Sequence, residues 1–262
     1  MMIRLEKNSY EQIYRLYLRS KFFFPLIASV LLDEQDGVVY VNKLNAPSQV
    51  YVEHAFGFAQ IFGNVDMHFE QELEQYLLFD KNFSADKVRL YAPYTPEFII
   101  KAQYEPLKSY RQRFVLGSEY PIDKSKILDQ ADKKISFSEV NQTNISIIES
   151  QFGLVSRFWR NGTDFIQKSN AVVILYEGEV ASICYAAAQA NNCSEIDVFT
   201  LPNYRSLGLA NKVVLYFITH CFELGLTPLW DCFTNNLGSM MLCKSVGFNA
   251  LNTPYPFFTI NK

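Results

Sequence analysis

The chain is predicted to be an α/β or α+β protein, and three observations lead to this expectation. Segments with the alternation of strands and segments with the period of helices follow one another along the sequence. Of the 262 residues, 49% are hydrophobic and 19% are charged, which is typical of a globular protein with ample core. In the second half, a strand-like run over residues 194–200 passes through a loop containing Pro and Gly into a long apolar-periodic segment.

The first half shows this alternation throughout. Residues 22–32 are apolar, but they are fewer than the ~20 residues that a membrane helix needs and include Pro25, so we expect a core segment. The turn D-E-Q-D-G ends at Gly37, where a strand is expected to begin. The expected strands are residues 37–41, 50–54, 87–92 and 113–116, and the expected helices are residues 10–19 and 67–78.

The second half is predicted in the same way. Residues 143–159 are expected to be helical, and a tight turn at Glu177-Gly178 joins two strands. The expected elements that follow are strands 171–176, 180–188 and 195–200, a long helix after Ala210, strand 229–233, a helix from Asn236 and a last strand at 257–260.

The charged stretch 121–134 is the expected domain boundary, although it could equally be a surface helix within one continuous domain. We therefore expect an N-terminal α/β domain of unassigned role at residues 1–134 and a second domain at residues 135–262.

The loop between the strand at 195–200 and the long helix has the features of an anion site. Arg205, Gly208 and Ala210 form the pattern R-x-x-G-x-A, in which the small residues let the backbone approach a phosphate closely. The N–H groups at the start of a helix have no partner within the helix and attract negative charge. The arrangement suits a pyrophosphate, but a turn of this kind is weak evidence by itself.

Two further elements follow the loop in a specific order. Residues 225–234 predict a short buried strand, and a helix capped by Asn236 ends at Gly247-Phe248. Over roughly residues 140–262 the chain resembles the GNAT superfamily of N-acetyltransferases. In that family R/Q-x-x-G-x-G/A follows the fourth strand, and a helix ending in x-G-F follows the fifth. Asn236 and Ser239 stand at the family's N-x-x-A/S spacing.

The resemblance implies a C-terminal GNAT fold, with a mixed central sheet flanked by helices. It resembles in particular a bacterial two-domain subgroup, which implies that the N-terminal domain is a degenerate GNAT-like copy. The implied activity is transfer of acetyl from acetyl-CoA to a primary amine by direct attack in a ternary complex. The alternative is a catalytically degenerate CoA-binding module with a sensing or interaction role.

The resemblance also implies which residues bind the cosubstrate. The fourth strand would bind pantetheine and the acyl carbonyl through its backbone, the loop would bind the pyrophosphate, and the helix cap would contact pantetheine. These residues are Val198, Phe199, Thr200, Arg205, Ser206, Leu207, Gly208, Leu209, Ala210, Asn236 and Ser239. The usual role of Asn236 as a helix cap competes with pantetheine for the same side chain.

Glu195 and Asp197 are the candidate bases. An amine with a pKa near ~10 is mostly protonated at neutral pH, so its attack requires a proton acceptor. The two carboxylates alternate on one strand and therefore face the same side of the sheet as Phe199. Several GNAT enzymes carry a glutamate base on this strand, and Glu195 lies nearest to that role. The alternative is that one or both sit at a solvated strand end.

Cys243 differs from the residue of many family members, which carry a tyrosine at this position that protonates the leaving CoA thiolate. A thiol could donate a proton to the leaving group, but a small buried cysteine is more typical of packing. Water or Tyr255 would then supply the proton.

Trp230 and Asp231 are candidates to line the acceptor site, with a core position as the alternative for the tryptophan. Arg157 and Arg160 could bind an anionic acceptor or interact with a helix dipole.

The composition limits the kinds of molecule that this protein is expected to bind. A net charge of -3 argues against nucleic acid or an anionic membrane, and we expect a small-molecule amine acceptor and a monomer or homodimer. Five cysteines without a C-x-x-C pair indicate a reducing, cytoplasmic location. Three scattered histidines predict no metal site.

Overall fold

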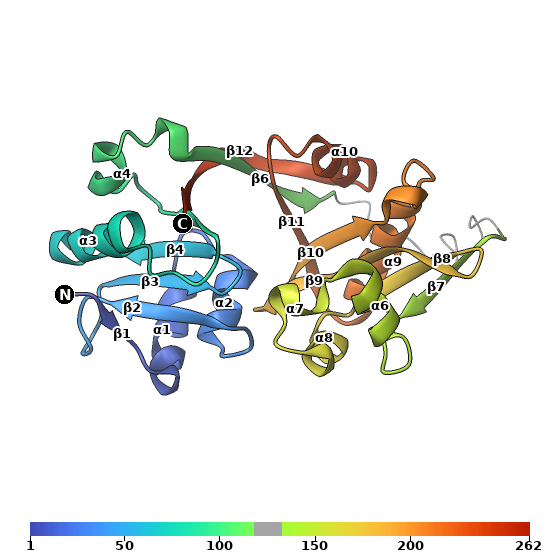
Figure 1. Ribbon diagram of the computed structural model, residues 1–262, viewed down its shortest axis with the longest axis horizontal. Helices are drawn as coiled ribbons and strands as arrows, with labels where there is room; N and C mark the ends of the chain where they lie inside the picture. Colours follow the sequence, from blue (N-terminus) through green and yellow to red (C-terminus); the bar gives the residue numbers. More distant parts are fainter. Residues whose placement is uncertain (118–132) are drawn as a thin grey trace. The chain divides into compact units, whose positions relative to one another are not determined.

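The computed structural model describes residues 1–117 and 133–262 (Figure 1). Contacts between residues divide the chain into two compact units. Unit 1 contains Met1–Arg111 and Tyr255–Lys262, and unit 2 contains Gln112–Pro254. The expected boundary between residues 134 and 135 falls inside unit 2, and most of the charged stretch 121–134 lies outside the described residues. The division differs because two long strands each begin in one unit and end in the other.

Unit 1 is a mixed sheet with helices. Its strands follow the order β1, β2, β3, β4, β5, β12 and β6, and the β4–β5 pair is parallel. The bounds are β1 (Ile3–Arg4), α1 (Tyr10–Tyr17), α2 (Pro25–Leu31), β2 (Gly37–Val41), β3 (Gln49–His54), β4 (Phe58–Gly63), α3 (Met67–Glu74), a π-helical segment (Gln75–Asp80), β5 (Lys87–Tyr91), α4 (Glu97–Lys101), short 3₁₀ turns at Lys7–Ser9 and Glu105–Leu107, the start of β6 (Lys108–Leu116) and the end of β12 (Phe248–Asn261).

Helices α2 and α3 of unit 1 lie where the sequence predicts a buried segment and a helix. All seven residues of α2 are buried, which confirms the apolar stretch around Pro25 as a core segment. Within the described part of the chain, no helix combines the length and apolar character that crossing a membrane requires. Helix α3 begins at the cap residue Asp66, whose carboxylate accepts a hydrogen bond from the N–H of Phe69 at 3.1 Å.

Unit 2 has the same kind of sheet. Its strands follow the order β7, β8, β9, β10, β11, β6 and β12, and the β10–β11 pair is parallel. The bounds are β7 (Ile135–Glu139), α6 (Ile145–Phe152), α7 (Val155–Phe158), α8 (Gly162–Lys168), β8 (Val172–Tyr176), β9 (Glu179–Ala190), β10 (Cys193–Thr200), a 3₁₀ turn (Pro202–Tyr204), α9 (Leu209–Glu223), β11 (Thr227–Phe233) and α10 (Leu237–Ser245).

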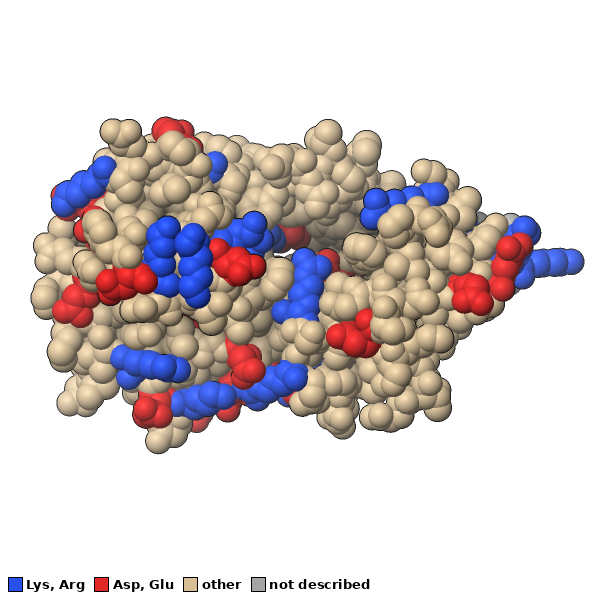
Figure 2. All heavy atoms as spheres, in the orientation of Figure 1, with Lys and Arg blue, Asp and Glu red and all other residues tan. Residues whose placement is uncertain are grey.

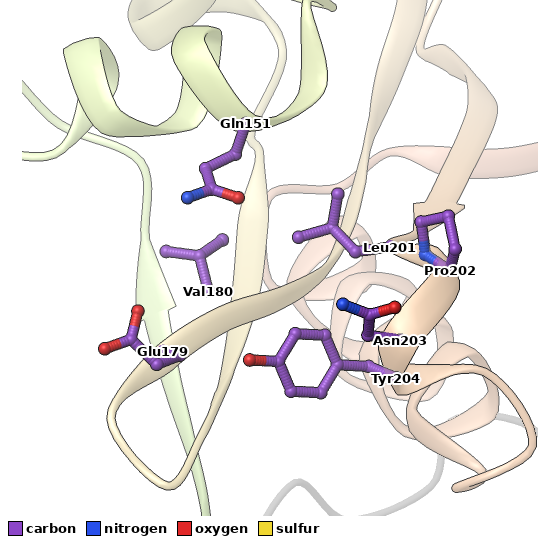
Figure 3. A pocket seen from close by; sticks show the side chains of 7 residues that line it. All are labelled: Gln151, Glu179, Val180, Leu201, Pro202, Asn203 and Tyr204. Atoms are coloured by element: carbon purple, nitrogen blue, oxygen red, sulfur yellow. The ribbon is translucent and has the colours of Figure 1, made fainter.

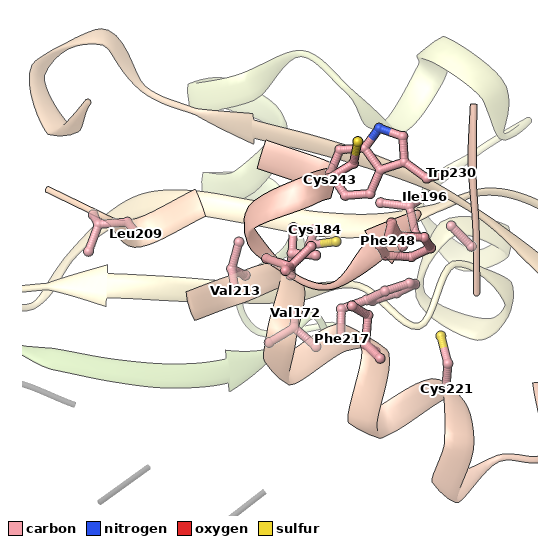
Figure 4. Close-up of a cluster of buried hydrophobic side chains, with 14 of the residues drawn as sticks. Val172, Cys184, Ile196, Leu209, Val213, Phe217, Cys221, Trp230, Cys243 and Phe248 are labelled. Carbon is pink, nitrogen blue, oxygen red and sulfur yellow. The ribbon is translucent and has the colours of Figure 1, made fainter. Parts of the chain in front are cut away.

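Helices cover both faces of the unit 2 sheet (Figure 1). On one face, apolar side chains of the strands pack against α9 and α10 in a single core cluster, part of which is shown in Figure 4. On the other face, the Trp159 indole N–H donates to the carbonyl of Ala186 at 3.0 Å. Phe165 of α8 contacts the ring of Tyr185 there, with 5.4 Å between ring centroids. The sheet therefore has one face for α9 and α10 and another for α6–α8.

The two units repeat one order of elements. In each unit a first strand is followed by helices and then by three antiparallel strands. A helix, a strand parallel to the one before that helix, and a further helix come next, before the last strand. In each, the strand next to the fifth one comes from the other half of the sequence, namely β12 in unit 1 and β6 in unit 2. This repetition confirms the expected mixed α/β fold and fits the expectation of a degenerate N-terminal copy.

Candidate functional site

Strands β10 and β11 separate part of the way along their length. Their ladder pairs Cys193 with Thr227 and ends where Glu195 pairs with Leu229. Both strands continue beyond this point, β10 to Thr200 and β11 to Phe233. The edge of β10 beyond Glu195 is therefore available, on the β11 side, to another hydrogen-bonding chain. This is the opening that the sequence resemblance predicts for pantetheine.

The loop after β10 ends at an open helix N-terminus. Gly208 is the N-cap of α9 with φ 73°, and its carbonyl accepts the first helical bond, from the N–H of Lys212 at 3.3 Å. A Cβ atom built at Gly208 has no heavy atom within 4 Å. Glycine meets the need for this left-handed conformation and leaves space over the first N–H groups of the helix. The donor set and the space both fit a phosphate.

Arg205 and its neighbours lie in the exposed part of this loop. The Nε atom of Arg205 donates to the carbonyl of Thr200 at 3.3 Å, and its guanidinium lies 6.0 Å from the ring centre of Phe199. Ser206 also has a positive φ, 65°, and Leu207 is exposed. Because Arg205 is held at the end of β10, its charge is placed at the entrance to the loop.

Glu195 and Asp197 have different surroundings on the face of α6–α8. The carboxylate of Asp197 accepts hydrogen bonds from Tyr185 Oη at 2.6 Å and from Arg157 Nη1 at 3.1 Å. Burial first, and then the charge of Asp197, raise the pKa of Tyr185, so its hydroxyl remains a donor. Tyr185 and Arg157 thus hold Asp197, and Glu195 lies where the β10–β11 ladder ends. The role of Glu195 as the base stays a prediction.

Arg157 lies in the last turn of α7, where the sequence expectation of an interaction with the helix dipole places it. It also pairs with Asp197, which the sequence did not suggest. Trp230 also takes the alternative position, since it lies in the core cluster on the face of α9 and α10. Asp231 follows it and lies on the opposite face, as alternation along a strand requires.

The start of α10 is held by a small network of side chains. The amide oxygen of Asn236 accepts a hydrogen bond from the N–H of Ser239 at 3.2 Å, so the expected cap is present. The Oγ atom of Ser239 in turn accepts from the indole N–H of Trp230 at 3.0 Å. This network fixes α10 to β11, and a role of Asn236 and Ser239 in binding pantetheine stays a prediction.

Cys243 lies in the interior of the core cluster (Figure 4). Its side chain is 0% exposed, and its thiol donates to the carbonyl of Met240 at 3.2 Å. Burial raises its pKa to about 12. The surroundings are those of a packing residue, which was the alternative to proton donation.

We expect Cys243→Ala to leave acetyl transfer within a few-fold of the wild type. The small cavity should lower the free energy of unfolding by about 1 kcal/mol, as measured by denaturant titration. A loss of about 100-fold in turnover with normal cosubstrate binding would instead assign a proton-donor role to this thiol.

Unit 1 has different residues at the two corresponding positions. Its β4–β5 ladder ends with Gln60 paired to Tyr91, so Gln60 corresponds to Glu195. Gln60 is buried, accepts a hydrogen bond from Tyr17 Oη at 2.6 Å and donates to the carbonyl of Phe22 at 3.0 Å. A neutral amide held in this way is not a base.

The helix that follows in unit 1 also differs from α9. Its cap is Asp66 in place of a glycine, and a hydrogen bond from Asn42 together with the N–H of Phe69 lowers the pKa of this carboxyl. A negative charge at this helix start would repel a phosphate. Both differences place the candidate site in unit 2.

A pocket of about 300 Å³ lies next to the candidate anion loop (Figure 3). Val180 and Leu201 line it, together with the polar side chains of Gln151 and Glu179. Leu201 is six residues from Glu195, and an extended strand of that length spans roughly 20 Å. The pocket is therefore too distant from Glu195 for direct proton exchange between them.

Arg113 is the residue of this region that the sequence did not suggest. Its Nε atom donates to Asp231 at 3.1 Å from the neighbouring strand β6. The sequence predicts a strand there, but it does not reveal that β6 lies beside β11. Within the described residues, no group of three or more His, Cys, Asp or Glu side chains is arranged to hold a metal ion.

Comparison with known proteins gives a consistent result. A family model described as GNAT acetyltransferase matches residues 20–258. The uncharacterised N-acetyltransferase YdfB of Bacillus subtilis (strain 168) is 26% identical over 271 residues, which cover 97% of each chain.

Solved structures share the fold over the full length. A GCN5-related N-acetyltransferase-like protein from Streptococcus suis 89/1591 superposes with a TM-score of 0.71 at 18% identity, over 97% of this chain and 99% of that one. A tandem GNAT protein from the clavulanic acid biosynthesis pathway superposes with a TM-score of 0.65 at 8% identity, over 100% of this chain and 98% of that one.

Proposed function

The chain belongs to the GNAT acetyltransferase family, and we propose that it transfers acetyl from acetyl-CoA to a primary amine in a ternary complex. One observation carries the proposal. Beyond Glu195, β10 leaves β11 and leads directly to the open N-terminus of α9 at Gly208. A peptide-like arm ending in a pyrophosphate needs these two features in this order.

In this proposal, a different segment of the protein binds each part of the cosubstrate. The backbone of Val198 to Thr200 would bind the pantetheine amides and the acyl carbonyl, and the N–H groups at the start of α9 would bind the pyrophosphate. Arg205 adds a positive charge at the loop entrance. The cosubstrate supplies an acyl group that is activated as a thioester.

Glu195 would accept the proton that the ammonium group of the acceptor must lose. A positioned carboxylate can do so directly or through one water molecule. Because Cys243 is buried, this proposal assigns the protonation of the leaving thiolate to water or to Tyr255.

The acceptor is proposed to be a small molecule. On the face shown in Figure 2, the Lys and Arg side chains of the described residues are interspersed with Asp and Glu side chains. Interspersed charges and a net charge of -3 suit a small cationic amine better than a polyanion. Amino sugars, polyamines and amino acids are the classes to test first.

The proposal is tested by incubating the protein with acetyl-CoA and a library of primary amines. We expect release of the CoA thiol that depends on the amine, together with an acetylated product seen by mass spectrometry. Saturable binding of CoA without transfer to any amine would favour the binding-module alternative. Failure to bind CoA at all would overturn both.

A further inference from the structure

The point where β10 and β11 separate is bordered by four residues, which we call the fork. Glu195 of β10 pairs with Leu229 of β11 in the last rung of the ladder, and Ile196 and Trp230 are the next residues along each strand. Because successive side chains alternate between the faces of a sheet, Ile196 and Trp230 lie on the face opposite to Glu195. Both belong to the core cluster on the face of α9 and α10.

The largest side chain of the fork is held from two sides. The indole N–H of Trp230 donates to the Oγ atom of Ser239 on α10 at 3.0 Å. Its ring contacts that of Phe248 on β12, with 5.5 Å between the centroids and 61° between the planes. The side chain of Trp230 is 2% exposed. Another rotamer would lose both contacts inside a packed core, so the indole has a fixed position at the fork.

The fork lies at the end of the path that the proposed function gives to the cosubstrate. The pyrophosphate would bind at Gly208, and the pantetheine arm would follow β10 from Thr200 towards Glu195, so the acyl group would be directed at the fork. Paired strands are only about 4.8 Å apart, so the ladder leaves no space between the strands beyond its last rung. The side chains of the fork therefore set the room for the acyl chain.

We propose that Trp230 limits the acyl group to a short chain, so that acetyl is accepted and butyryl is excluded. This inference rests on the proposed function and adds the residue that sets the acyl size. A fixed indole does not move aside, and each additional methylene group must displace packed atoms. In an apolar pocket one methylene group changes the specificity by about 10- to 200-fold.

The test compares kcat/KM for acetyl-CoA, propionyl-CoA and butyryl-CoA with the best amine found. The wild type should prefer acetyl-CoA to butyryl-CoA by about 100-fold or more. Trp230→Phe removes one ring of the indole and keeps an aromatic side chain in the core. It should reduce the preference to about 10-fold or less by raising the rate with butyryl-CoA, and Trp230→Leu should reduce it further. Trp230→Phe gives the answer by itself should Trp230→Leu not fold.

Trp159 provides the matched control, because it is the other tryptophan of the chain. It is also buried, but it lies on the face of α6–α8, where its indole N–H donates to the carbonyl of Ala186 at 3.0 Å. Trp159→Phe makes the same chemical change on the opposite face of the sheet. We expect the ratio of kcat/KM for acetyl-CoA and butyryl-CoA to stay within a few-fold of the wild type.

Two further readouts do not depend on turnover. In Trp159→Phe, Trp230 is the only tryptophan, so its fluorescence reports on the fork. Titration with acetyl-CoA, without an amine, should change this emission, whereas the emission of Trp159 in Trp230→Phe should change much less. Isothermal calorimetry should show that the wild type binds butyryl-CoA at least about tenfold more weakly than acetyl-CoA. Trp230→Phe should bind both with similar affinity.

The outcomes separate this proposal from the proposed function. Similar kcat/KM values for acetyl-CoA and butyryl-CoA in the wild type, or an unchanged ratio in Trp230→Phe, would overturn the role of Trp230. If the wild type binds acetyl-CoA but acetylates no amine, the proposed function fails. The affinity ratio and the fluorescence of Trp230 then still decide whether this residue limits the acyl group.

Discussion

Replacing Gly208 by glutamate is expected to abolish binding of coenzyme A. The new carboxylate would enter the space over the first turn of α9, where nothing now lies within 4 Å of a Cβ position. It would occupy the phosphate volume and carry the same sign of charge. The positive φ of 73° adds strain, of order 1–3 kcal/mol, that the helix must absorb. We expect isothermal calorimetry to detect no binding at concentrations that saturate the wild type.

Gly225 provides the matched control at the other end of the same helix. Its φ is 71°, and a Cβ atom there also has nothing within 4 Å. Gly225→Glu therefore introduces the same strain and the same charge away from the loop. We expect it to lower stability while CoA binding stays within a few-fold of wild type. Unchanged affinity in Gly208→Glu would contradict the assignment of this loop to the pyrophosphate.

The second half of the chain was largely predictable because its signals are local. Strand alternation, the cap at Asn236 and the glycine at Gly208 each act within a few residues of sequence, and the structure has elements at all three places. The edge strand β7, with the sequence I-S-F-S-E, is not among the strands expected from the sequence, because its charged neighbours are typical of a domain boundary. The expected last strand at 257–260 is part of a much longer one, β12, in the structure.

What could not be predicted depends on contacts between distant segments. Strand β4 has buried residues on both faces, so it lacks the alternation that would have revealed it. The exchange of β6 and β12 between the units has no local signature either. For this reason the pairing of Arg113 with Asp231, and the extension of unit 2 back to Gln112, are visible only in the structure.

The same distinction between local signals and contacts of distant segments applies to the residues of the candidate site. The positive φ of Gly208 was predictable, because only a few residue types tolerate it. The different surroundings of Glu195 and Asp197 were not, since Arg157 and Tyr185 reach Asp197 from other elements. From the sequence, the two carboxylates could be named and the resemblance placed Glu195 nearest to the role of the base, but the pairing of Asp197 with Arg157 and Tyr185 could not be predicted.

We expect Glu195→Gln to lower turnover at neutral pH by about 10²- to 10⁴-fold, the usual contribution of a positioned base. The amide keeps the shape and most of the hydrogen-bonding capacity of the carboxylate, so folding and CoA affinity should be retained. Glu139→Gln, on the exposed strand β7, is the matched control and should leave turnover unchanged.

The dependence on pH distinguishes a base from a structural glutamate. An acceptor amine with a pKa near ~10 becomes neutral as the pH rises. Below that pKa, each increase of one pH unit provides about ten times more of the neutral, reactive form. Turnover of Glu195→Gln should therefore recover with rising pH more steeply than that of the wild type, which already removes the proton itself. The measurement is a rate profile against pH for both proteins on the best amine found. Superimposable profiles would show that Glu195 is not the base, and Asp197→Asn would then be the variant to examine, since Asp197 faces the same side of β10.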